Sequence, residues 1–132
     1  MPEIKKWMKP FHIERGDVYM VDLGNERDTV GSEQAGIRPA VVTQCDRQNR
    51  HSTTVLVAAG TSHLKRQDLP YHVVLPVVKG LPKQTMICAE QRFAISVDRF
   101  IKYCCTLDRK TMKRIARACH RAEEEEKKRR RW

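Results

Sequence analysis

The chain has 132 residues, enough for one compact hydrophobic core and few for two domains of ordinary size. Its longest apolar stretch, residues 55–59, is far shorter than the roughly 20 residues of a membrane-spanning helix or the roughly 7 of a signal-peptide core, so we expect a cytoplasmic protein that does not enter a membrane. The formal net charge is +10, but residues 109–132 hold 11 Lys or Arg against 4 Glu, which leaves the preceding residues close to balance.

Residues 1–14 are predicted to form a short packed arm, because their apolar residues have helical spacing but Pro10 interrupts any longer helix. From residue 17 the sequence changes to short runs rich in β-branched and aromatic residues, which predict strands. These runs span residues 17–23, 38–45, 54–61, 71–75, 85–91, 93–97 and 101–104. Six or seven short strands within about 90 residues predict a mainly β protein, folded as a small barrel or a strongly coiled sheet.

The longest connection between these strands is the 13-residue segment 24–36, and loops of this length are more often functional than idle. After the last strand, Asp108 stands at a helix N-cap position. The apolar residues that follow it have the spacing of a buried helical stripe: Met112, Ile115, Ala116 and Cys119. An amphipathic helix is therefore predicted over about residues 109–126.

The chain ends in a charged tail, residues 123–132, in which four glutamates each precede a cation by four residues. This orientation favours helical ion pairs, so the tail is interpreted as a solvated helix end. The closing cations and Trp132 leave a second interpretation open, in which the tail also contacts the phosphates and bases of a nucleic acid.

A short segment around Pro39 holds the strongest concentration of chemically capable side chains. Pro39 favours an extended conformation at Arg38, so this arginine is expected to start a strand. Just before it, two glycines flank a polar triad and permit a turn: Ser32, Glu33 and Gln34. The guanidinium of Arg38 stays charged and is suited to bind a phosphate through two parallel hydrogen bonds, although an ion pair with Glu33 is the structural alternative.

Polar residues also follow two apolar runs, with Thr61 and Ser62 after residues 55–60, and Glu90 and Gln91 after residues 86–89. If the strands close on one another, these strand ends are expected to line one cleft.

The histidines and cysteines form no recognisable motif. The five histidines are scattered, with no two of them four residues apart. The five cysteines contain neither a Cys-x-x-Cys motif nor a disulfide framework, so we expect reduced thiols. The spacing therefore disfavours a metal-dependent nuclease, and we expect no metal and no cofactor.

Several segments, in the same order along the chain, resemble the MazF/PemK family of toxin endoribonucleases from bacterial toxin–antitoxin systems. They are RGDVY at residues 15–19, GSEQAG at 31–36, RPAVV at 38–42, TVLVAA at 54–59, LPYHV at 69–73 and EQ at 90–91. The resemblance covers about residues 15–120. Cys88 stands where the PemK branch carries an arginine, so the chain resembles the MazF branch.

The resemblance implies an SH3-like β-barrel of the MazF and CcdB type with a C-terminal amphipathic helix. The chain would then consist of the N-terminal arm, a toxin domain over residues 15–122 and the charged tail. The resemblance also implies a homodimer that cleaves single-stranded RNA, chiefly mRNA, at short sequences without a metal ion, and that a cognate MazE-like antitoxin blocks. Metal-free cleavage uses the adjacent 2′-hydroxyl as nucleophile and gives a cyclic phosphate and a 5′-hydroxyl.

Carried over residue by residue, Arg38 is the catalytic arginine and Thr61 the threonine that ends the Val-Ala-Ala strand. On chemical grounds, Glu33 is the candidate general base. The residues expected to contact RNA are Ser32, Gln34, Gln44, Ser62, Glu90 and Gln91. Two other classes of function remain open: a non-catalytic nucleic-acid-binding barrel and a gyrase poison of the CcdB type.

Overall fold

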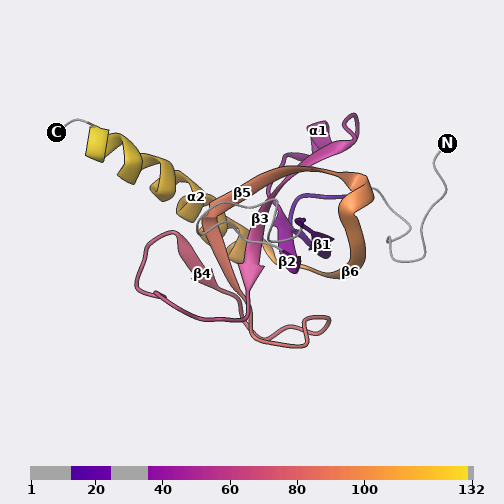
Figure 1. Ribbon diagram of the computed structural model, residues 1–132, viewed down its shortest axis with the longest axis horizontal. Coiled ribbons are helices and arrows are strands. Elements are labelled where there is room, and N and C mark those ends of the chain that lie inside the picture. The colour runs from indigo at the N-terminus through magenta and orange to yellow at the C-terminus, as the bar shows by residue number, and fades with distance from the viewer. Residues whose placement is uncertain (1–12, 25–35, 131–132) are drawn as a thin grey trace.

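The computed structural model describes residues 13–24 and 36–130, with side chains as far as residue 124. The elements in chain order are β1 (Asp17–Asp22), β2 (Ile37–Val42), α1 (Asp46–Asn49), β3 (Thr54–Thr61), β4 (His72–Val74), β5 (Met86–Ser96), the 3-10 turn η2 (Val97–Arg99), β6 (Phe100–Thr106) and α2 (Arg109–Arg130). The strands coil around one another, and the C-terminal half of α2 extends away from them (Figure 1). Nearly all of the N-terminal arm expected over residues 1–14 lies outside the described residues.

The strands form one six-stranded antiparallel sheet in the order β4-β5-β3-β2-β1-β6. Along β2, Val41 belongs to one buried cluster and Val42 to the other, and Ala58 and Val57 of β3 alternate in the same way. Because both faces of these central strands are buried, their sequences consist of nearly unbroken apolar runs. The mainly β fold that the sequence predicts is confirmed.

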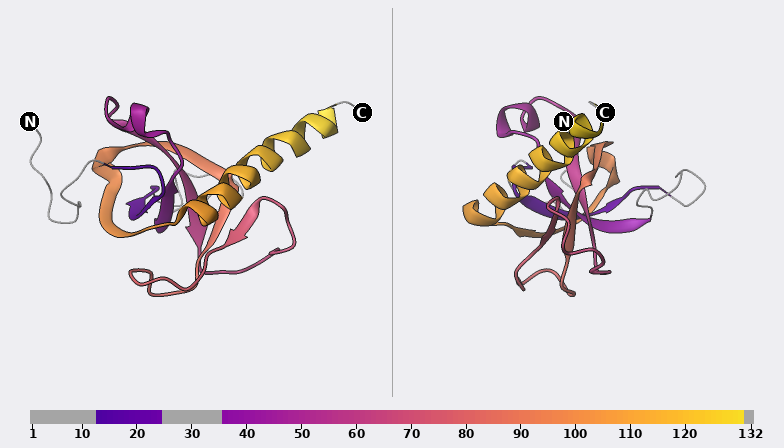
Figure 2. Two further views of the ribbon diagram at one scale, coloured as in Figure 1. Left: turned by 180° about the vertical axis from the view of Figure 1, so that it is seen from behind. Right: turned by 90° about the vertical axis from the view of Figure 1, so that its left-hand side faces the viewer.

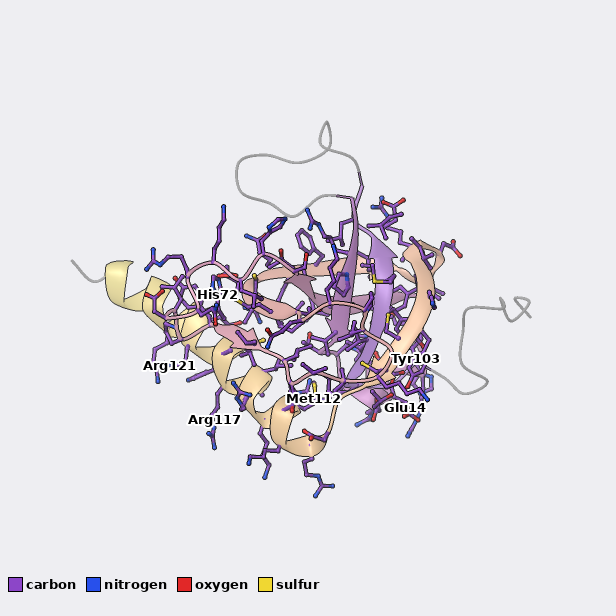
Figure 3. All side chains as sticks on the ribbon, turned by 90° about the horizontal axis from the view of Figure 1, so that it is seen from below. Glu14, His72, Tyr103, Met112, Arg117 and Arg121 are labelled. Atoms are coloured by element: carbon purple, nitrogen blue, oxygen red, sulfur yellow. The ribbon has the colours of Figure 1, made fainter. Side chains whose placement is uncertain are left out.

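Helix α2 covers one face of the sheet (Figure 2). Met112, Ile115 and Ala118 pack into the buried cluster on that face, whereas Ala116, which was expected in the stripe, is exposed. On the opposite side of the helix, the exposed Arg117 and Arg121 project away from the sheet (Figure 3). The face of α2 that is buried is thus the one that contacts the sheet.

The start of α2 is confirmed at the predicted position. Asp108 accepts a hydrogen bond from Thr111 N–H at 2.7 Å, the bond of an N-cap residue. This bond holds the pKa of Asp108 below its ordinary value. The helix continues to Arg130, four residues past the predicted end, so much of the charged tail belongs to α2.

Strand β5 is continuous where the sequence predicts two strands, residues 85–91 and 93–97. Its register against β3 shifts by three residues between the pairs Ala58↔Arg92 and Gly60↔Ile87. The strand bends at this shift without ending. Polar residues at the shift interrupt the apolar pattern, which is why the pattern alone suggested a break.

Candidate active site

The ends of the 24–36 segment are joined to each other by backbone hydrogen bonds. Gly36 N–H donates to the carbonyl oxygen of Gly24 at 2.6 Å, and Leu23 N–H donates to that of Gly36 at 3.0 Å. Gly24 and Gly36 have φ values of 98° and 76°, in the left-handed region that favours glycine. The segment therefore leaves β1 and enters β2 at fixed points, two residues before Arg38. The triad Ser32, Glu33 and Gln34 falls in this segment, outside the described residues.

Arg38 and Thr61 come together across the β2–β3 pairing. The β2–β3 register runs from Val42↔Val57 to Ala40↔Ala59, and continuing it by two residues would bring Arg38 opposite Thr61. Side chains that oppose each other in an antiparallel pair have Cβ atoms about 4.5–5.5 Å apart. The antiparallel pairing therefore brings these two residues, distant in the sequence, to the same end of the hairpin, where the 24–36 segment enters β2.

A close backbone approach at Gly60 supports this alignment. A Cβ atom at Gly60 would lie 3.1 Å from the carbonyl oxygen of Pro39 and 2.8 Å from Cγ2 of Thr85. Only a hydrogen fits in this space without displacing a neighbour. Gly60 therefore lets β3 lie tightly between β2 and β5, next to the position of Arg38 and Thr61.

Thr61 and Arg38 are both set back from bulk solvent. Thr61 is 7% exposed, and its Oγ1 accepts a hydrogen bond from His63 N–H at 3.1 Å, so the hydroxyl oxygen is oriented and its hydrogen is left to be donated elsewhere. Arg38 is half-buried at the start of β2. A guanidinium and a hydroxyl donor at this spacing are suited to bind the oxygens of a phosphate. Ser62 follows Thr61 and is exposed.

Glu90 and Gln91 do not end a strand, contrary to the sequence prediction. They lie within β5 at its register shift, where Gln91 is half-buried. Glu90 Oε2 lies within hydrogen-bond distance, 2.7 Å, of Nε2 of His72, a half-buried residue of β4. Glu90 is thus directed toward β4 rather than toward the start of β2.

One cluster of potential metal ligands was not predicted from the sequence. His72, Cys88 and Glu90 each offer a ligand atom within 4.8 Å of the other two. The group forms because β4 and β5 pair with His72 opposite Cys88. Burial, together with the charge of Glu90, raises the pKa of the Cys88 thiol to about 12. Only the strand register could have revealed this cluster.

Gln44 lies away from the other candidate residues. Its amide nitrogen donates to Asn49 Oδ1 at 2.9 Å, and its amide oxygen accepts from Leu56 N–H at 3.3 Å. Six residues separate it from Arg38, roughly 20 Å along an extended chain. Gln44 therefore ties α1 to β3 at the opposite end of the β2–β3 hairpin.

One known protein family matches almost the whole of the described sheet and helix. The family described as "PemK-like, MazF-like toxin of type II toxin-antitoxin system" matches residues 14–122. The chain belongs to this toxin family. The match begins just before β1 and ends within α2, so it includes every strand of the sheet.

Two curated relatives of the toxin family are similar over most of their length. Endoribonuclease EndoA of Bacillus subtilis is 37% identical over 107 residues, which are 80% of this chain and 90% of that protein. Endoribonuclease MazF of Staphylococcus saprophyticus is 38% identical over 107 residues, which are 80% of this chain and 87% of that protein.

Solved structures of the toxin family share the fold. An endoribonuclease in complex with its cognate antitoxin from Mycobacterial species superimposes with a TM-score of 0.70 at 22% identity, covering 85% of this chain and 95% of that one. MazF from Deinococcus radiodurans has a TM-score of 0.69 at 19% identity, covering 84% and 96%. The expected MazF-type fold is confirmed.

Within residues 13–24 and 36–130, no helix is both long enough and apolar enough to cross a membrane.

Proposed function

We propose that the chain is the toxin of a type II toxin–antitoxin pair and acts as a metal-independent endoribonuclease on single-stranded RNA. The observation that supports this most directly is the antiparallel β2–β3 pairing, which puts Arg38 at the start of β2 next to Thr61 at the end of β3. Two relatives at 37% and 38% identity are endoribonucleases, which supports the same activity. Arg38 supplies positive charge and Thr61 a hydroxyl donor. These side chains can stabilise the negative charge of the phosphate oxygens, which other nucleases stabilise with a metal ion.

The reaction begins when a 2′-hydroxyl of the RNA loses its proton and attacks the adjacent phosphorus. The phosphorane that forms carries additional negative charge on its oxygens, which the Arg38 guanidinium and the Thr61 hydroxyl stabilise. The bond to the 5′-oxygen then breaks, and this oxygen takes up a proton. The products are a 2′,3′-cyclic phosphate and a 5′-hydroxyl. Catalysis by Arg38 depends on stabilising charge, because a guanidinium gives up its proton only at a high energetic cost.

The segment before β2 supplies the remaining chemistry in this proposal. Glu33 takes the proton of the 2′-hydroxyl as general base, and Ser32 and Gln34 contact the RNA next to the cleaved bond. Their place in the sequence supports these roles, since the segment re-enters the fold two residues before Arg38.

Ser62, Glu90 and Gln91 extend the proposed RNA surface along β3 and β5. Ser62 is exposed directly after Thr61, and Glu90 is exposed on β5. Gln44 is not part of this surface, because both ends of its amide group bond within the β2–β3 hairpin.

The proposed partners follow from the family. A cognate MazE-like antitoxin is expected to block the RNA surface, and the chain is expected to form a homodimer in the cytoplasm, where its RNA substrates are found. One of the similar structures is itself a complex of an endoribonuclease with its antitoxin, which supports a partner of this kind.

The deciding experiment uses a long RNA of mixed sequence, excess EDTA and the purified chain. We expect discrete cuts with 5′-hydroxyl ends, and we expect Arg38→Ala to abolish them while part of the RNA binding remains. Arg47→Ala is the matched control, because Arg47 is exposed on α1 at the far end of the β2–β3 hairpin. Full cleavage by Arg38→Ala would refute the assigned role.

Two other results would point to the alternative functions. RNA that is bound but never cut would indicate a non-catalytic binding module. A chain that neither binds nor cuts RNA but arrests gyrase would indicate a poison of the CcdB type.

A further inference from the structure

A compact group of three potential metal ligands lies where β4 pairs with β5. His72 stands opposite Cys88 in the register, and Glu90 follows Cys88 by two residues along β5. An imidazole nitrogen, a thiol sulfur and a carboxylate oxygen lie within 4.8 Å of one another. Strand pairing therefore assembles the group before any ion binds.

Two of the three side chains, those of His72 and Cys88, are shielded from solvent, and the histidine ring is oriented. Cys88 is 5% exposed, and the side chains of His72 and Glu90 are 11% and 30% exposed. His72 Nδ1 lies 2.9 Å from the carbonyl oxygen of Arg66, an acceptor, so Nδ1 donates and Nε2 faces Glu90 at 2.7 Å. Zinc-bound histidines have this arrangement, in which the second ring nitrogen donates to a carbonyl or a carboxylate.

The mixture of donors selects a class of ion. Thiolate and imidazole ligands suit zinc and similar transition metals, whereas calcium and magnesium require oxygen ligands. Zinc bonds of about 2.0–2.3 Å in a tetrahedral arrangement place neighbouring ligand atoms roughly 3.3–3.8 Å apart. The spacing in this group, 2.7 Å between His72 and Glu90 and at most 4.8 Å within the set, lies around that value.

The group lies close to the proposed catalytic pair. Thr61 pairs with Met86 of β5, and Cys88 is two residues further along the same strand. Thr61 and Cys88 are thus diagonal neighbours, which in a regular sheet are about 7–8 Å apart. An ion held by Cys88 and Glu90 would therefore lie beside the proposed RNA surface.

We propose that His72 Nε2, Cys88 Sγ and the Glu90 carboxylate bind one zinc-class divalent ion, and that this binding lowers the rate of RNA cleavage. The effect on cleavage rests on the proposed function, whereas the binding does not. On binding, the Cys88 thiol and the His72–Glu90 hydrogen bond each release one proton to solvent, and the ion takes the place of both protons. Glu90 is then held by the ion and no longer contacts RNA.

The binding experiment uses the full chain stripped of metal and Co²⁺ as the spectroscopic probe. We expect a thiolate-to-cobalt charge-transfer band that saturates at one ion per chain and that Zn²⁺ displaces. Cys88→Ser should remove the band and weaken binding by at least about tenfold. Cys45→Ser should leave it intact, because Cys45 is an exposed thiol at the start of α1. Absence of the band, or an equal band in Cys88→Ser, would overturn the site.

A second measurement needs no variant. Zn²⁺ should protect Cys88 of the unaltered chain from slow alkylation, read by peptide mass spectrometry, while Cys45 stays reactive. Equal labelling of Cys88 with and without Zn²⁺ would contradict the site even if Cys88→Ser failed to fold.

The effect on activity is tested by comparing the rate of RNA cleavage in EDTA with the rate in saturating Zn²⁺. We expect about a tenfold loss of rate in the unaltered chain and no loss in Cys88→Ser. Equal inhibition of both proteins would overturn the effect on cleavage. If the metal-free chain cuts no RNA at all, the proposed function fails, and the cobalt band still decides whether the metal site exists.

Discussion

The hydroxyl of Thr61 is the smallest group with a proposed chemical role in RNA cleavage. Its oxygen accepts a hydrogen bond from His63 N–H, and its own hydrogen can be donated to a phosphate oxygen. We predict that Thr61→Val lowers the cleavage rate by about 10²-fold, the usual loss for one donor to a developing oxyanion. Single-turnover cleavage of a short RNA measures this rate.

Thr61→Ser provides the control for that experiment, because it keeps the hydroxyl and loses only a methyl group. We expect this variant to keep most of the rate. If serine and valine at position 61 cleave equally slowly, the side chain acts through packing, and its role as a donor is wrong.

Gly60 allows β3 to pack closely against β2 and the residue before β5. A methyl group at this position would press on the backbone of Pro39 and on Thr85, both of which belong to neighbouring segments. We predict that Gly60→Ala lowers the free energy of unfolding by about 1–3 kcal/mol, the range for overpacking a tight site. Urea unfolding measures the change, and an unaltered midpoint would contradict the close approach.

The N-terminus of α2 should respond to pH in a defined direction. The hydrogen bond from Thr111 lowers the pKa of Asp108, so the charged carboxylate is stabilised in the folded state. Its contribution is present above the ordinary value of 3.8 and is lost as the pH falls through the lower folded value.

Asp108→Asn tests this, because asparagine caps a helix without titrating. The difference in unfolding free energy between the two proteins should shrink as the pH falls from neutral to about 3, measured by urea unfolding at each pH. A difference that does not change with pH would contradict a charged cap.

The sequence predicted the parts of the fold that depend on local pattern. The strands that carry Arg38 and Thr61 were predicted, because Pro39 identifies the start of β2 and the apolar run before Thr61 identifies β3. The continuity of β5 was missed, since the polar residues at its bend interrupt the pattern although the backbone continues. The grouping of His72 with Cys88 was missed for another reason: these residues meet only through the pairing of β4 with β5, and local sequence does not specify this register.

Across the whole molecule, the five cysteines differ in how far they are exposed to solvent. Cys45 is exposed, Cys88 is buried, and the other three are half-buried. Burial raises the pKa of Cys88 to about 12 and that of Cys105 to about 11, which keeps these thiols protonated. Because the thiolate is the reactive form, reactivity should follow exposure across the fold.

We therefore predict that a brief pulse of iodoacetamide labels Cys45 first and Cys88 last in the native chain. Peptide mass spectrometry after quenching gives the order, and the same pulse in denaturant should label all five alike. Rapid native labelling of Cys88 would mean that the β4–β5 pair opens readily, and it would also argue against a preassembled metal site.

The hydrogen bonds that join Gly24 to Gly36 separate two parts that can change independently. On the sheet side of these bonds, Arg38 pairs with Val21 of β1, and β2 pairs with β3 through backbone outside residues 25–35. Residues 25–35 could therefore be exchanged for those of another family member without moving the arginine. An exchange that keeps a carboxylate at position 33 would then change the proposed RNA contacts of this segment while Arg38 and Thr61 keep their places.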